Sequence, residues 1–367
     1  MSQTYKITLK PIGAFYFGGE ESFSSAPLDG VANTKHDSTK KYFKKRQGYF
    51  AKSEMFPQQT QLLGMLRKEL LRSNKKLYYF KNFVRVPKVF KADATNIVGH
   101  GRWVTTTDTL DLGSIQELTP LYIEKEKKCY ISAPFDKDLT LEATGEGYIN
   151  GRPSQAYAFK KGDGKYFGAK DYLCTDLIAK DKSKLKIDKI FTSFTQTQTQ
   201  TLGYKEDDEE QLFKVKKYRL DEACCFVCYL TLKNDTFLDT LTTNIELGGE
   251  RSRFVMQVSK ADKPNIESDF AYLKTEQSRI VLISDAFVEA KIFDSCKVTL
   301  SQKRILRTLK RPFNKSKKTL LLAKGTVFYP QEGKENEVRE MIAEVKNFTT
   351  IGYNQYLDLT QGEKNAH

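Results

Sequence analysis

The sequence is poor in the residues that most catalytic and metal-binding sites need. Its 367 residues include three histidines, one tryptophan and six cysteines. The histidines are His36, His100 and His367, and none of them lies in an H-E-x-x-H zinc motif. Walker-type phosphate loops and nucleophile elbows are also missing. We therefore expect no catalytic centre, no resident metal and no cofactor.

The cysteines do not form a recognisable metal set. Cys225 and Cys228 make one C-x-x-C pair, but it lies in an apolar run that predicts a strand. Side chains three residues apart on a strand point to opposite faces, so this pair cannot chelate one ion. Neither a second C-x-x-C nor a nearby histidine completes a zinc site. We expect buried, free thiols.

Long hydrophobic runs are also missing. The longest apolar stretches are far shorter than the roughly 20 residues that a membrane helix needs, and the first ten residues contain no apolar signal-peptide core. We expect a soluble, cytoplasmic protein without membrane contact.

Basic and aromatic residues are abundant instead. Sixty lysines and arginines against 46 acidic residues give a formal charge of +14, and 24 Phe and 19 Tyr indicate a folded core. An excess of this size favours a polyanionic partner.

The hydrophobic periodicity predicts an α+β fold with antiparallel sheets. Tyr5, Ile7 and Leu9 alternate with polar residues, which predicts a half-buried first strand. Further strands are expected at residues 83–89, 118–123, 128–132, 211–217, 224–232, 254–258, 279–287, 297–300, 319–329 and 357–359. Short helices are expected at 235–242 and around Val338 to Val345. Because strands and helices do not alternate steadily, a parallel doubly wound sheet is disfavoured.

The clearest helix covers residues 59–73. Leu62, Leu63, Leu66 and Leu70 recur at helical spacing, with basic residues on the other side. Thr60 is the expected N-cap. An acidic run at 206–210 suggests a boundary between an N-terminal module at 1–204 and a C-terminal module at 205–367.

Three segments could contact a polyanion. One is a long polar loop, 18–46, with basic residues from Lys35 to Arg46; RNA and protein are equally open as its partner. Another is 303–318, the densest basic cluster, for which we expect no compensating acid. The third is Gly248-Gly249 followed by Arg251 and Arg253, where glycines permit close backbone approach and alternate arginines could grip RNA.

Several blocks occur in the order found in one protein family. They are Phe15 to Gly19, Ser53-Glu54-Met55-Phe56-Pro57-Gln58-Gln59-Thr60 leading into Leu63 to Arg67, Leu247 to Arg251, and Ala323 to Tyr329. With these blocks the chain resembles the RAMP superfamily of CRISPR proteins, and most closely the subunit-three family of the type III-B Cmr effector complex.

The resemblance implies two ferredoxin-like (RRM-like) modules with long inserted loops. It also implies a subunit that holds the 5′ handle of the crRNA, bridges a Cas10-type large subunit and a backbone RAMP subunit in a hetero-oligomer, and cuts nothing itself. The implied RNA-binding residues are Ser53, Gln58, Gln59, Thr60, Arg67, Gly248, Gly249, Arg251 and Arg253.

Two other hypotheses remain open at this point. The chain could be a RAMP endoribonuclease that processes CRISPR repeat RNA with His36 or His100 as general base. It could instead be a scaffold whose basic loops face acidic protein partners.

Overall fold

The computed structural model describes residues 2–18, 21–24, 48–80, 83–100, 111–149, 152–168, 173–201, 210–233, 241–308 and 317–360. Within them, strands outnumber helices and nearly all strand pairs are antiparallel. The expected α+β class with antiparallel sheets is confirmed. In the same part of the chain, no helix is both long and apolar enough to cross a membrane.

The first sheet has the strand order β12-β11-β8-β7-β15-β1-β17-β16, and β6 also pairs with β15. The expected first strand is β1, in which Tyr5, Ile7 and Leu9 are fully buried. The strands are β1 (Gln3–Pro11), β6 (Ile115–Leu118), β7 (Tyr122–Lys125), β8 (Lys128–Ser132), β11 (Leu177–Ala179), β12 (Lys184–Leu185), β15 (Cys224–Leu232), β16 (Thr242–Glu246) and β17 (Arg253–Lys260).

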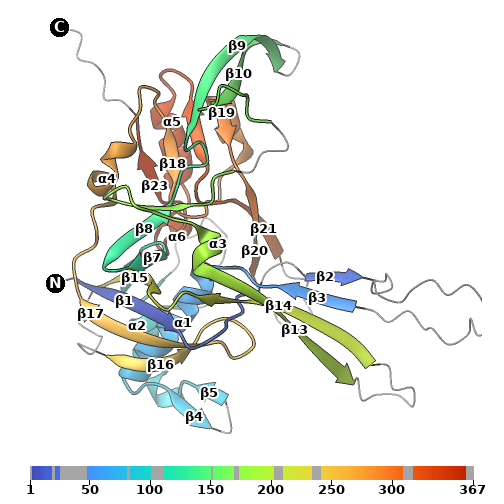
Figure 1. The fold of residues 1–367 in the computed structure, drawn as a ribbon. Helices are drawn as coiled ribbons and strands as arrows, with labels where there is room; N and C mark the ends of the chain where they lie inside the picture. The colour runs from blue at the N-terminus through green and yellow to red at the C-terminus, as the bar shows by residue number, and fades with distance from the viewer. Residues whose placement is uncertain are drawn as a thin grey trace, which may run out of the picture.

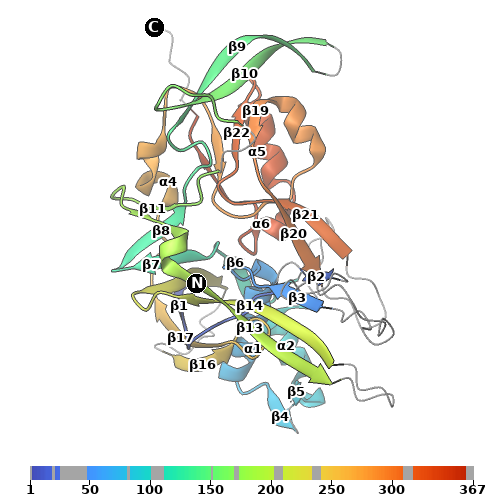
Figure 2. The ribbon, with the colours of Figure 1, turned by 45° about the vertical axis from the view of Figure 1, so that its right-hand side comes forward.

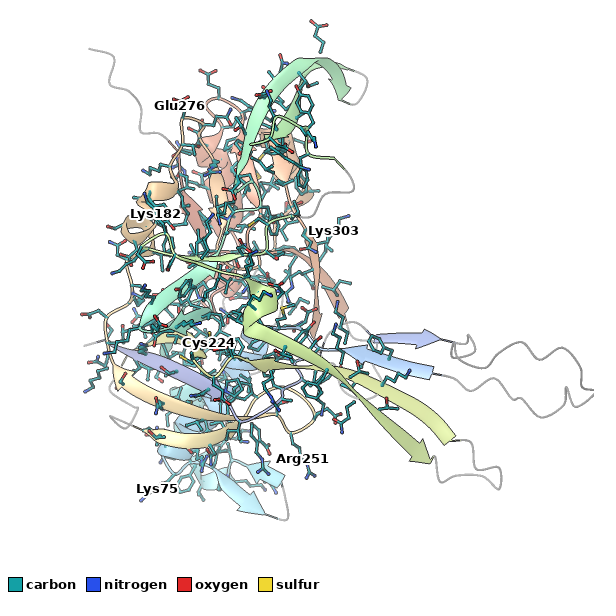
Figure 3. The ribbon with its side chains drawn as sticks, viewed as in Figure 1. Lys75, Lys182, Cys224, Arg251, Glu276 and Lys303 are labelled. Carbon is teal, nitrogen blue, oxygen red and sulfur yellow. The ribbon has the colours of Figure 1, made fainter. Side chains whose placement is uncertain are left out.

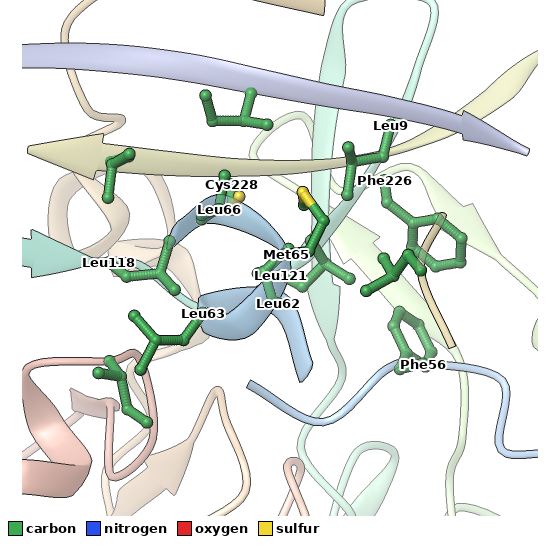
Figure 4. Packing of buried hydrophobic residues seen from close by; sticks show 14 of the residues in the cluster. Leu9, Phe56, Leu62, Leu63, Met65, Leu66, Leu118, Leu121, Phe226 and Cys228 are labelled. Atoms are coloured by element: carbon green, nitrogen blue, oxygen red, sulfur yellow. The ribbon is translucent and has the colours of Figure 1, made fainter. Parts of the chain in front are cut away.

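Helix α1 (Gln59–Ser73) covers one face of this sheet. Its leucines 62, 63, 66 and 70 are buried, as their spacing predicts. Figure 4 shows Leu62, Met65 and Leu66 packed beneath β1 and β15, beside Leu9, Phe226 and Cys228. The shorter α2 (Lys91–Val98) packs against α1.

A second sheet, of order β19-β22-β18-β23, packs against the other face of the first. Val227 and Tyr229 of β15 share a cluster with Val281 and Tyr329 of this sheet. The strands are β18 (Ile280–Leu282), β19 (Cys296–Leu300), β22 (Val327–Pro330) and β23 (Tyr356–Asp358), with η3 (Ala290–Ser295), α5 (Glu335–Ala343) and α6 (Lys346–Thr349) beside them. Central strand β15 is therefore buried on both faces, which explains its continuous apolar sequence.

Long hairpins project from this body (Figures 1 and 2). Strands β13 (Phe191–Thr201) and β14 (Glu210–Leu220) form the longest, and β3 (Gly48–Lys52) and β2 (Glu21–Ser24) extend it into the sheet β13-β14-β3-β2. The others are β9 (Leu139–Ile149) with β10 (Arg152–Lys161), β20 (Lys303–Thr308) with β21 (Lys317–Leu322), and β4 (Tyr78–Phe80) with β5 (Phe83–Arg85). The remaining short elements are η1 (Lys88–Phe90), α3 (Ile187–Ile190), α4 (Ile266–Asp269) and η2 (Ala271–Leu273).

Some expected elements differ from the structure. The predicted strand 83–89 is strand only at 83–85, and Pro87 precedes a 3-10 turn, because proline cannot donate to a ladder. Thr242, expected to end a helix, begins β16; residues 235–240 lie outside the described residues. The predicted strand 279–287 is shortened to β18, while the closing strand and last helix are confirmed.

The strands of the first sheet come from both sides of residue 204. β1 lies between β15 and β17, with seven register pairs to each. The expected boundary between 1–204 and 205–367 therefore falls between strands of one sheet. Of the acidic run that suggested it, residues 206–209 lie outside the described residues.

Candidate nucleic-acid interface

The N-cap of helix α1 lies two residues before the expected one. Gln58 is the N-cap, and its backbone N–H donates to Oε1 of Gln61 at 3.2 Å. Thr60, the predicted N-cap, is the second helical residue, so that prediction was wrong. Gln61, the third helical residue, bonds back to the backbone of the N-cap, which is the role of that position in a capping box.

Gln59 is used for packing and lies away from solvent. The residue is 7% exposed, and Nε2 donates to the carbonyls of Thr119 at 3.0 Å and Gly352 at 3.2 Å. Gly352 has φ +86, and a Cβ there would lie 2.3 Å from that nitrogen. Gln59 thus joins α1 to the C-terminal loop and is not available to a ligand.

Ser53 has a similar structural role. Its buried hydroxyl accepts the N–H of Phe17 at 2.9 Å and donates to the carbonyl of Glu54 at 2.8 Å. Phe17 stacks on Phe254 with ring centroids 5.8 Å apart. Ser53 therefore fixes the aromatic segment that follows β1.

Gly248 and Gly249 form the turn between β16 and β17. Gly248 has φ +94, and a Cβ there would lie 2.4 Å from the carbonyl oxygen of Tyr16. The N–H of Gly249 donates to the same oxygen at 2.8 Å. The glycines therefore admit the close approach of the chain's own backbone at Tyr16.

The two arginines after these glycines are exposed. Arg251 has φ +53 and belongs to the turn, so the expected extended segment begins only at Arg253, the first residue of β17. Neither guanidinium has an ion pair within the described part of the chain. Figure 3 shows Arg251 pointing away from the body, below the base of the β13–β14 hairpin.

Arg67 lies elsewhere. It sits on α1 on the side of Asp111, and burial lowers its pKa while the Asp111 carboxylate opposes that shift. The predicted site therefore separates into two parts. Tyr16 and Phe17 bring the Gly248 turn close to Ser53, but Gln59 and Arg67 face other parts of the protein.

Strand β20 carries a charge cluster that the sequence did not reveal. Arg304 pairs with Glu54 at 2.7 Å and with Asp285 at 2.9 Å. The expectation that segment 303–318 lacks compensating acid was therefore wrong, because Glu54 lies 250 residues away in sequence. The described part of this segment is also a hairpin rather than a loop.

Lys324 lies in the same cluster. Its Nζ sits over the Phe56 ring, 3.0 Å from the centroid. Burial lowers the pKa of this ammonium to about 7; Asp285 opposes the shift and Arg304 adds to it. Because Phe56 precedes α1 and Lys324 precedes β22, the cluster joins the start of α1 to the second sheet.

The cysteine and histidine predictions have different outcomes. Cys228 packs in the core beneath α1 and Cys225 in the core between the sheets, so they point to opposite faces of β15 as predicted. Among the described residues, no group of three or more His, Cys, Asp or Glu side chains could hold a metal. His100 is exposed after α2, and His36 lies outside the described residues.

Sequence comparison identifies the family. The model of the family described as CRISPR-associated protein (Cas_Cmr3) matches residues 151–360. This match covers more than half of the chain, and the protein therefore belongs to the Cas_Cmr3 family of CRISPR-associated proteins. No curated protein matches the chain.

Several solved structures resemble the chain at low identity. A chain of the type III-B Cmr-beta complex bound to cognate target RNA and AMPPnP has a TM-score of 0.47 and 12% identity, with 96% of each chain covered. The same complex bound to cognate target RNA alone gives the same values. A chain of a type III-A Csm3–Csm4 subcomplex has a TM-score of 0.37 and 10% identity, covering 89% of this chain and 93% of that one.

Proposed function

We propose that this chain is a non-catalytic, RNA-binding subunit of a type III-B CRISPR effector complex. It holds the 5′ handle of the crRNA and bridges a Cas10-type large subunit and a backbone RAMP subunit. The observation that carries the proposal is the exposed pair of Arg251, in the turn, and Arg253, at the start of β17, neither of which has an ion pair among the described residues. The chain that presents them is a member of the Cas_Cmr3 family.

The arginines suit RNA by their chemistry. A guanidinium can bind phosphate oxygens in pairs and can stack on an unpaired base. The rigid turn supports this role, because Gly249 and Ser252 anchor it: Oγ of Ser252 accepts the N–H of Tyr16 at 2.9 Å and donates to the carbonyl of Gly249 at 2.7 Å.

The proposal includes two ferredoxin-like modules. That fold has the element order β-α-β-β-α-β. In the first sheet the neighbours β7-β15-β1-β17 are the second, third, first and fourth strands, with α1 after the first. In the second sheet β19-β22-β18-β23 repeats that order, with η3 and α5 in the helical places. We place the boundary between the modules at residues 261–279, after β17 and before β18.

Handle binding is tested with a guide RNA and a scrambled RNA of equal length. We expect the Arg251→Ala/Arg253→Ala variant to bind the handle about 10- to 100-fold more weakly for each arginine removed, since a hydrogen bond to a charged group contributes about 1.5–3 kcal/mol. Fluorescence anisotropy on the full chain measures both affinities.

Arg85→Ala is the matched control, because Arg85 is also exposed and without an ion pair in the described structure, but lies on the β4–β5 hairpin. Equal affinity of the wild type for both RNAs would contradict handle recognition. We expect intact RNA after incubation; cleavage that His36→Ala or His100→Ala abolishes would make the protein a nuclease.

A further inference from the structure

A cationic face lies on the projecting sheet β13-β14-β3-β2 and contains none of the residues of the Gly248 turn. In the ladder between β14 and β3, Lys216 is the neighbour of Lys52 and Lys214 the neighbour of Phe50. On the other side of β14, Lys216 faces Thr195 and Lys214 faces Thr197. Neighbours across a ladder share one face, and residues two apart on a strand also do. Lys52, Lys214, Lys216, Thr195 and Thr197 therefore form one surface, which we name the lysine face.

The lysine face is open to solvent and has unbalanced charge. Lys52, Thr195 and Thr197 are exposed, and Lys214 and Lys216 are partly exposed. None of the three ammonium groups has an ion pair with a described residue. The nearest described carboxylate along the chain, Glu54, is already bound to Arg304 at 2.7 Å.

Two adjacent lysines without an acid repel each other. Like charges directly opposite in a sheet destabilise it, so the Lys52–Lys216 pair is a cost to the free protein. A bound anion between the two ammonium groups would remove that repulsion. This arrangement therefore indicates a ligand with closely spaced negative charges.

The neighbouring groups select phosphate over base edges. Threonine hydroxyls donate to phosphate oxygens, and lysine acts as a point charge without the planar fork that reads a base pair. Phe50, beside Lys214, is the aromatic side chain that the β3 register adds to this surface, and it is partly exposed.

We propose that the lysine face binds the phosphodiester backbone of RNA regardless of its sequence. This inference rests on the proposed function for its ligand, but it assigns different residues and a different kind of contact. The Gly248 turn reads the handle, and the lysine face holds the RNA backbone along the projecting sheet. Figures 1 and 2 show where this sheet leaves the body.

The test is the salt dependence of RNA binding by the full chain. Each phosphate contact on a single strand contributes about 0.7 to the slope of log affinity against log salt. In the variant Lys52→Gln/Lys214→Gln/Lys216→Gln we expect the slope to fall by about 2. Affinity should fall by the same factor for the handle RNA and for the scrambled RNA.

The matched control is Lys127→Gln/Lys180→Gln/Lys274→Gln, which removes the same charge from exposed lysines outside the projecting sheet. Its slope should stay at the wild-type value. Thermal unfolding of both variants checks that the fold is intact. An unchanged slope in the lysine-face variant, or no RNA binding by the wild type at low salt, overturns the proposal.

The two proposals fail in distinguishable ways. A loss confined to the handle RNA would overturn sequence-independent binding and leave handle recognition standing. Equal wild-type affinity for both RNAs, with the slope still reduced in the variant, would overturn handle recognition and support the lysine face. If the lysine-face variant binds RNA normally but fails to assemble with protein partners, the face is a protein interface and the proposal is wrong.

Discussion

At the scale of single residues, the family motifs in this chain mark packing contacts as much as ligand contacts. The hydroxyl of Ser53 bonds the backbone of Phe17, and the amide of Gln59 bonds the backbone of Thr119 and Gly352. Gly248 is required by the approach of the Tyr16 carbonyl. Among the proposed RNA contacts, Gly248, Gly249, Arg251 and Arg253 are exposed.

Gly248→Ala tests the turn itself. An L side chain at φ +94 is strained, and its Cβ would meet the Tyr16 backbone at 2.4 Å. We expect the free energy of unfolding to fall by about 1–3 kcal/mol, measured by urea denaturation.

Gly64→Ala is the control of opposite sign. Gly64 is an exposed residue inside α1, with no atom within 4 Å of an added Cβ. Alanine should stabilise the helix there by about 0.5–1 kcal/mol. If both variants unfold like the wild type, the conformation of Gly248 is not a constraint.

At the scale of elements, the β20–β21 hairpin is held by two carboxylates from other parts of the chain, Glu54 and Asp285. Arg304 links it to Glu54 before α1 and to Asp285 after β18. Lys324, which follows the hairpin in sequence, places its ammonium over the ring of Phe56. The most basic segment of the sequence thus uses part of its charge to hold the two sheets in position.

Lys324 gives this junction a pH dependence. Its folded pKa of about 7 lies below the ordinary lysine value because burial penalises the ammonium. Between these two values the unfolded chain binds the proton and the folded chain does not, so the unfolding free energy rises with pH. The contribution is at most about 1.4 kcal/mol per pH unit.

Lys324→Met should remove that contribution. The unfolding free energy of the variant minus that of the wild type, measured by urea denaturation from pH 6 upward, should be most positive at about pH 7 and below. It should fall as pH rises, because the wild type gains stability as Lys324 loses its proton. Lys180→Met, at an exposed position, should show a constant difference. A constant difference for Lys324→Met would contradict the lowered pKa.

At the scale of the whole molecule, the two sheets are joined by a buried ion pair as well as by the shared core. Asp136, after β8, is fully buried and accepts from Arg279, just before β18, and from the hydroxyl of Tyr329 on β22. Arg279 also donates to the carbonyl of Leu273 at 2.8 Å.

Asp136→Ala would leave the Arg279 charge buried without its partner. We expect a loss of about 3–5 kcal/mol in the free energy of unfolding, measured by urea denaturation. Asp176→Ala is the control, since Asp176 pairs with Lys137 at 3.9 Å and is partly exposed. Its loss should stay within about 1 kcal/mol. Equal losses for the two variants would show that the buried pair stabilises the fold no more than a partly exposed one.

Local sequence patterns determined the secondary structure and the overall chemistry of this protein. Alternation predicted β1, leucine spacing predicted α1, and the excess of lysine and arginine predicted a polyanionic partner. These properties depend on neighbours within a few residues, so a single sequence contains them. That strands from both sides of residue 204 share one sheet could not be predicted, because the pairing of β1 with β15 and β17 joins residues more than 200 positions apart.

The tertiary structure alone decided which motif residues reach solvent. Gln59 and Arg251 are both polar residues in family motifs, yet one is buried against Gly352 and the other is exposed. Likewise, Lys52 and Lys216 become neighbours only because β3 and β14 pair. The charge of Arg304 is paired only because the fold brings Glu54 and Asp285 beside it. Burial and pairing of charges are set by non-local packing, which no local pattern records.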